Sequence, residues 1–283
     1  MPGGAEWKSS YRWKVWYNKS PDEPACGGGC SSAAWRFFLG IAILVLTRNP
    51  NLFPTVIMLG NFMVPAAYVA FFYERRHLSS LTMPETAACF LYGGVLGVFA
   101  AALLEPLLIR QMNAPNAFLV GLIEEFAKIL GVLLLIRRQR HDLEFDGLVL
   151  GAAAGMGFAA LESTGYAFTA LLSSGGGLSA SLIVTLMRGL FAPVGHGTWT
   201  AILAAVLFRE SGPKHFRFNG RVILAYLSVS ALHGLWDVLP VLFGAFLWPG
   251  LDMLVGQLII GCLGIVVLVR RWRETRRVAE SVT

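Results

Sequence analysis

The chain has 283 residues, of which 55% are hydrophobic and only 14% are charged, and its mean hydropathy is +0.61. A soluble domain carries roughly 25% charged residues, so the composition excludes an ordinary soluble globular protein. The formal charge of +6 does not indicate nucleic-acid binding, because the basic residues stand in short clusters between apolar stretches, as they do in membrane loops. We therefore expect membrane lipid, and no nucleic acid, around the protein.

The apolar stretches predict an all-α fold, a polytopic bundle of about eight transmembrane helices with about 20 residues each. A basic, aromatic and largely irregular tail over residues 1–32 precedes the predicted transmembrane domain at 33–269, and a second basic tail covers 270–283. The predicted spans are 33–48, 52–73, 85–108, 115–136, 145–172, 178–208, 222–245 and 247–269.

Loop charges predict how these spans are oriented. The two tails and every second loop carry nearly all of the Lys and Arg residues, whereas the opposite loops carry only Arg48 and Arg110. This is the positive-inside pattern for an even number of spans. We therefore expect both termini in the cytoplasm, in an ordinary multi-pass plasma membrane arrangement.

Two cysteines in the N-terminal tail, Cys26 and Cys30, flank three glycines. They are compatible with half of a zinc site, but the sequence offers no second pair of ligands nearby. The interpretation that we favour is a flexible linker with two free thiols.

Ionisable side chains are concentrated in the fourth to seventh predicted spans. A charge near the bilayer centre costs about 2.5–3.5 kcal/mol, so such residues are expected to face the bundle interior and to mark a functional site. Several of them lie within about 6 Å of the middle of their own span, at 1.5 Å per residue, so four helices can present them at one level. The residues are Glu124, Glu125, Lys128, Glu162, Arg188, His196, His233 and Asp237.

Helical spacing predicts which of these side chains share a face. Glu124 and Lys128 are four residues apart and can pair, whereas Glu125 points about 100° away from Glu124. His233 and Asp237 also share a face. Asp237 then either orients His233 or itself faces the reaction centre.

Two neutral imidazoles together with carboxylates are a ligand set that suits Zn²⁺. His196, His233 and one of Glu125 or Glu162, with Glu162 preferred, would hold the metal and leave one position open for water. Glu124 would take a proton from that water and pass it to a leaving amine.

Other roles remain open on the sequence alone. Lys128 and Arg188 either stabilise an oxyanion or only neutralise the acids. A proton- or cation-coupled transporter is the alternative function, because carboxylates and histidines in membrane helices also form proton relays. Such a transporter should show inverted repeats and broken helices, and the sequence shows neither.

Four short motifs resemble those of the PrsW-type intramembrane proteases. Residues 124–128 resemble the family's Glu-Glu-x-x-Lys motif, and residues 158–162 its Phe-x-x-x-Glu motif. Residues 188–196 resemble the third motif and residues 233–237 the last. The motifs occur in the family's order within residues 115–240, each inside a predicted span.

This resemblance implies an intramembrane endopeptidase related to the CAAX prenyl proteases, in a bacterial inner membrane. Its substrate would be a membrane-anchored protein such as an anti-sigma factor. The resemblance assigns catalytic roles to Glu124, Glu125, Glu162, His196 and His233. In related families a metal-free mechanism is also argued, in which Glu124 and His196 activate the water while His233 and Asp237 hold the oxyanion.

Overall fold

The structure is a computed structural model that describes residues 27–75, 79, 81–111, 113–136, 143–173, 175, 177–211, 215–243 and 251–280. Every regular element in this part of the chain is helical, which confirms the predicted all-α class. The elements are α1 (Gly27–Thr47), the short 3₁₀ helix η2 (Pro50–Leu52), α2 (Phe53–Glu74), α3 (Met83–Leu108), α4 (Ala114–Ile136), α5 (Glu144–Ser173), α6 (Leu178–Glu210), α7 (Gly220–Phe243) and α8 (Leu251–Glu280).

Each predicted span coincides with one α-helix, with the largest differences at the two ends of the chain. α1 begins at Gly27, six residues before the predicted start at 33, and α8 continues to Glu280 instead of ending at 269. An apolar stretch marks only the part of a helix that lies in lipid, whereas backbone hydrogen bonds continue the helix into polar sequence. Cys26 and the side chain of Cys30 lie outside the described residues.

Six helices among the described residues are long and apolar enough to cross a membrane, so the chain is a multi-pass membrane protein. The apolar part of α1 over Ser32–Thr47 is shorter than these six helices. α4 carries three charged residues within its apolar sequence, at positions 124, 125 and 128. The total of about eight spans and the cytoplasmic location of both termini stay predictions.

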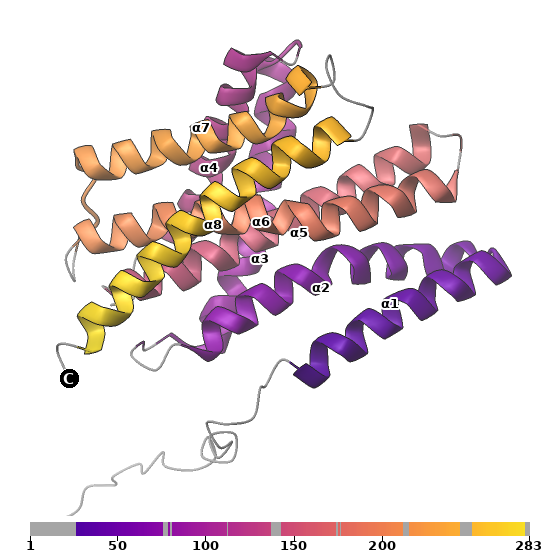
Figure 1. Ribbon diagram of the computed structural model, residues 1–283, viewed down its shortest axis with the longest axis horizontal. Coiled ribbons are helices and arrows are strands. Elements are labelled where there is room, and N and C mark those ends of the chain that lie inside the picture. The colour runs from indigo at the N-terminus through magenta and orange to yellow at the C-terminus, as the bar shows by residue number, and fades with distance from the viewer. Residues whose placement is uncertain are drawn as a thin grey trace, which may run out of the picture.

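Helices α5 and α6 form the centre of the bundle and have the most extensive contact of any helix pair described. In Figure 1 they lie side by side, with α7 above them and α1 and α2 below, while α8 crosses obliquely in front of α6 and α3 and α4 run steeply behind. The turn between α5 and α6 includes Gly175, whose φ of +64° is a left-handed conformation that glycine adopts at no steric cost.

Small residues allow the central helices to approach closely. Gly147, Gly151 and Gly155 recur at every fourth position of α5 and face the backbone of α6. A Cβ at Gly147 would lie 2.5 Å from the carbonyl oxygen of Ala204. Close approach of backbones at small residues is the usual basis of helix association in membranes, and here it brings α6 against α5 along the length that carries the candidate site.

Candidate active site

The ionisable side chains singled out in the sequence meet at one place, between α4, α5, α6 and α7. Each of them lies within salt-bridge distance of at least one other. α4 contributes Glu124, Glu125 and Lys128; α5 contributes Glu162; α6 contributes Arg188 and His196; and α7 contributes His233 and Asp237.

Glycines at the helix crossings set how closely these side chains approach. Gly121 of α4 lies against the backbone of α7, and a Cβ at Gly234 of α7 would lie 2.8 Å from the backbone nitrogen of Phe118 on α4. Gly155 of α5 lies against the carbonyl oxygen of His196. The carboxylates of α4 and the imidazole of α7 therefore meet because no side chain separates these two backbones, and Gly155 lets α6 bring His196 close against α5.

Lys128 is the central cation of the cluster and is completely buried. Its Nζ donates to Glu124 Oε2 at 3.0 Å and to Glu125 Oε1 at 2.8 Å, which confirms the predicted pairing with Glu124. It also lies 2.9 Å from His196 Nδ1, which must accept because an ammonium has no lone pair. The ring of Phe158 covers the ammonium at 3.9 Å. A buried ammonium requires such partners, since an unpaired buried charge is strongly destabilising.

Glu125 has hydrogen-bond partners on both of its oxygens. Oε2 accepts a hydrogen bond from Thr200 Oγ1 at 2.8 Å, and Oε1 accepts from Lys128 and lies 3.1 Å from His233 Nδ1. With Nδ1 donating to this carboxylate, the lone pair of His233 is on Nε2. A carboxylate that orients a histidine in this way is typical of metal and catalytic sites.

The free Nε2 of His233 faces Glu124, whose Oε2 lies 3.3 Å away. Glu124, His196 and His233 each offer one ligand atom, and these atoms lie within 4.8 Å of one another. Ligands of a tetrahedral zinc ion lie about 2.0–2.2 Å from the metal, so two of them are separated by roughly 3.5 Å. The donor types and their separations fit a divalent metal, which would take the place that the Lys128 ammonium occupies between Glu124 Oε2 and His196 Nδ1.

This group differs from the one expected from the sequence, in which Glu162 or Glu125 supplied the carboxylate ligand and Glu124 accepted the proton. Glu162 Oε2 lies 2.5 Å from Arg188 Nη2 and 3.2 Å from His196 Nε2. Both oxygens of Glu125 have hydrogen-bond partners as described above. Glu124 is the carboxylate with an oxygen that lies within 4.8 Å of a nitrogen of each imidazole.

One edge of the cluster is open. The side chains of Glu162, Arg188 and Asp237 are 17%, 21% and 26% exposed, whereas those of Glu124 and His233 are at most 4% exposed. Asp237 Oδ2 lies 3.7 Å from His233 Nε2. The cluster is therefore open to its surroundings at the edge formed by these three polar side chains.

The sequence interpretation did not include several residues that shape the site. Thr200 binds Glu125, and the Trp199 ring lies 4.8 Å from the His233 ring, centroid to centroid. Glu105 of α3 interacts with the side chain of Glu124. Thr200 stands four residues after His196 on the same helical face, and Glu105 is a carboxylate inside a predicted span, so both carried a signal in the sequence.

Carboxylates and imidazoles buried among four membrane helices define a polar site inside the bundle, which is compatible with an intramembrane hydrolase. The family model described as "PrsW family intramembrane metalloprotease" matches residues 83–273. Over 183 residues the chain is 25% identical to "Protease PrsW" of Halalkalibacterium halodurans, an alignment that covers 62% of this chain and 80% of that protein. No solved structure matches the chain significantly. The chain belongs to the PrsW family of intramembrane metalloproteases, as the sequence motifs predicted.

Proposed function

We propose that this protein hydrolyses a peptide bond of a membrane-anchored protein at the cluster around Glu124, His196 and His233. The observation that carries the proposal is the position of Glu124 Oε2, which lies 3.3 Å from His233 Nε2 and 3.8 Å from His196 Nδ1 in a buried site. Membership of a protease family favours hydrolysis over the cation-coupled transport that was the alternative on sequence grounds.

The metal that we propose is Zn²⁺, with Glu124, His196 and His233 as its ligands. When bound, such an ion supplies Lewis-acid chemistry for activating water and polarising the substrate carbonyl. Glu125 accepts the Nδ1 proton of His233 and so keeps the Nε2 lone pair available. Lys128 neutralises part of the negative charge of Glu124 and Glu125.

The open edge supplies the remaining groups for hydrolysis. Arg188 has exposed surface, and its Nε has no hydrogen-bond partner, so its guanidinium can stabilise the oxyanion of a tetrahedral intermediate. Lys128 is fully engaged and does not serve this role. Asp237, beside His233 Nε2, can hold the proton released by the attacking water and return it to the leaving amine. Glu162 is the weaker base because it is paired with Arg188.

One observation favours a second, metal-free mechanism. The ammonium of Lys128 lies 3.0 Å from Glu124 Oε2 and 2.9 Å from His196 Nδ1, so a cation already bridges two of the three candidate ligands. In that mechanism Glu124 and His196 activate the water, while His233 and Asp237 hold the oxyanion.

The substrate that we propose is a protein with a single transmembrane helix, with an anti-sigma factor as the candidate that family resemblance supports. The positive charge of alternate loops supports an orientation with both termini in the cytoplasm, and likeness to a bacterial relative supports a bacterial plasma membrane. Comparing new protein N-termini in membranes from cells with the wild-type protein and with Glu124→Ala identifies the natural substrate.

Cleavage of single-span membrane proteins by the purified protein in detergent tests the proposal. We expect His233→Ala and Glu124→Ala to lower kcat/KM by about 10³-fold or more. Each substitution removes one of three side chains that we propose act together in catalysis. His215→Ala is the matched control, since His215 is exposed and outside the cluster. Folded variants of Glu124 and His233 that cleave as fast as the wild type would refute the assignment.

Metal content separates the two mechanisms. Elemental analysis of the purified protein should find about one zinc ion per chain, and Glu124→Ala and His233→Ala should lose it. Glu162→Gln should retain the metal, whereas it would lose it if Glu162 were the carboxylate ligand as the sequence suggested. Fully active protein that contains no metal and resists chelators would establish the metal-free mechanism.

A further inference from the structure

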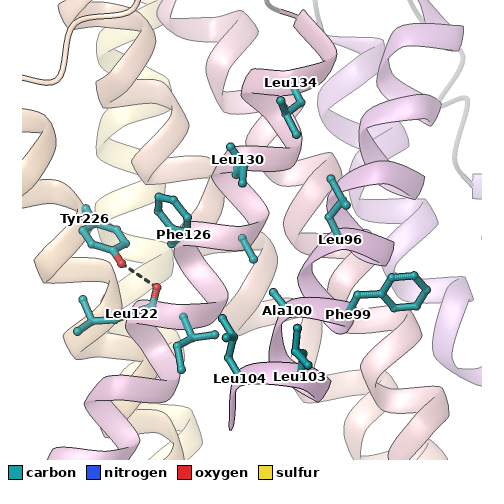
Figure 2. Close-up of a pocket in the computed structure, with 12 residues that line it drawn as sticks. Leu96, Phe99, Ala100, Leu103, Leu104, Leu122, Phe126, Leu130, Leu134 and Tyr226 are labelled. Carbon is teal, nitrogen blue, oxygen red and sulfur yellow. Dashed lines mark hydrogen bonds between the residues drawn. The ribbon is translucent and has the colours of Figure 1, made fainter. Parts of the chain in front are cut away.

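An apolar groove of about 570 Å³ lies on the outer surface of the bundle between α3 and α4 (Figure 2). Its walls are mainly leucine and phenylalanine side chains of these two helices, and Phe126 on the α4 wall is 55% exposed. On the α7 side, the hydroxyl of Tyr226 donates a hydrogen bond of 2.7 Å to the carbonyl oxygen of Leu122. This bond fixes one wall of the groove to α4.

A second hollow of about 350 Å³ continues the groove across α4 toward α7. The two hollows share Phe126, Leu130 and Tyr226. Along α4 the lining runs from Leu122 to Leu134, a rise of about 18 Å at 1.5 Å per residue. That length is about three helical turns and more than half of the roughly 30 Å hydrocarbon thickness of a bilayer.

The groove lies directly behind the candidate active site. Ile123 and Ala127 line it, and they are the chain neighbours of Glu124 and Lys128, whose side chains belong to the buried cluster. On the α3 side Leu104 lines the groove, and the next residue is Glu105. Only α4 and its seam with α3 therefore separate the groove from the cluster.

Glu105 lies at this seam with one acceptor left unused. Its side chain interacts with Glu124, while its Oε1 is buried without a hydrogen-bond partner. A buried acceptor without a partner is unfavourable, so a donor that enters the seam gains a hydrogen bond there. The backbone N–H of an unwound peptide is a donor of this kind.

We propose that the groove between α3 and α4 docks the transmembrane helix of the protein substrate, and that the substrate enters the active site through the seam at Glu105. This inference rests on the proposed function. The catalytic imidazoles and Glu124 are almost completely buried, so a peptide that starts from the groove has to pass between α3 and α4 to reach them. An apolar helix fits a groove with these dimensions and linings, and its unwound end would meet the free oxygen of Glu105.

Photo-crosslinking tests the docking surface. The photoreactive residue p-benzoylphenylalanine is placed at Leu130 in the groove or at Leu263 of α8, which is 51% exposed but outside it. The probe is a single-span peptide with an alternating leucine and alanine helix, in phosphatidylethanolamine–phosphatidylglycerol vesicles. We expect several-fold more peptide adduct from position 130. Equal yields from both positions, or adducts with lipid alone at position 130, would overturn the proposal.

A matched pair of substitutions on α3 tests the same proposal by kinetics. Ala100 lines the groove, whereas Ala102 is exposed on the same helix outside it. Ala100→Phe should raise the KM for a cleaved single-span substrate about tenfold, equivalent to about 1.4 kcal/mol of lost binding, with little change in kcat. Ala102→Phe should leave both constants unchanged. If both variants behave like the wild type while cleavage persists, the groove does not dock the substrate and the protease assignment stands. Absence of cleavage by the wild type would instead refute the proposed function.

Discussion

Helices α5 and α3 are both apolar and long enough to span a membrane, yet α5 lies inside the bundle and α3 lies at its outer surface. The most apolar window of α5 is 89% buried inside the protein, whereas that of α3 is only 22% buried, although α3 is the more hydrophobic helix. In a bilayer, lipid tails are as apolar as leucine, so large aliphatic side chains gain little by facing inward. Small residues face inward instead, because they let backbones approach.

The same difference separates the two roles that we propose for the bundle, catalysis and substrate docking. The glycine-lined contact of α5 with α6 holds Glu162, Arg188 and His196 in fixed positions. The contact of α3 with α4 leaves leucine and phenylalanine side chains on the outer surface and a groove between them. We therefore expect substitutions in the first region to change stability and chemistry, and those in the second to change access of the substrate.

The largest difference in stability should come from one substitution made in both regions. Leu150 of α5 is completely buried, whereas Leu107 of α3 is 71% exposed. Leu150→Ala should lower the free energy of unfolding in detergent by about 2–5 kcal/mol, since it leaves a cavity in a packed core. Leu107→Ala should change it by less than about 0.5 kcal/mol. Equal effects in denaturant titrations would show that burial in the bundle does not decide stability.

A smaller effect is expected when a side chain is added to the glycine contact. A Cβ at Gly147 would lie 2.5 Å from Ala204 O and 2.7 Å from Phe208 Cγ, whereas one at Gly165 on the same helix meets nothing within 4 Å. Gly147→Leu should therefore cost about 1–3 kcal/mol through overpacking, seen as a lower midpoint of thermal unfolding. Gly165→Leu should keep the wild-type midpoint. A stable Gly147→Leu protein would contradict the close contact of α5 and α6.

The smallest change concerns one hydrogen bond on α6. Thr200→Val keeps the shape of the side chain but removes the donor to Glu125 Oε2. The looser Glu125 should orient His233 less well and lower kcat/KM by about 10- to 100-fold, and its unpaired buried oxygen should lower the free energy of unfolding by about 1 kcal/mol. Thr198→Val is the control, because Thr198 is equally buried but its hydroxyl contacts Tyr68. Equal kinetics for the two variants would show that the hydrogen bond from Thr200 does not position Glu125 for catalysis.

Sequence reasoning located the helices well because the length of an apolar stretch is set by the thickness of lipid. It was least accurate at Gly27 and Glu280, where helices continue into polar sequence. It also singled out the charged residues that the structure brings together, because charge inside lipid is costly whatever the helix arrangement; their catalytic roles stay predictions. It did not identify Glu105, whose importance depends on α3 packing beside α4.

The sequence by itself determined the all-α class, the family and the set of acids and imidazoles within the spans, since these follow from composition and local motifs. Only the tertiary structure decided which carboxylate lies between the imidazoles. On the sequence alone, either Glu124 or Glu162 can supply the carboxylate beside His196 and His233. Which of them does so depends on how α4, α5, α6 and α7 are rotated against one another. That rotation is set by backbone contacts at Gly121, Gly155 and Gly234, between residues far apart in the chain.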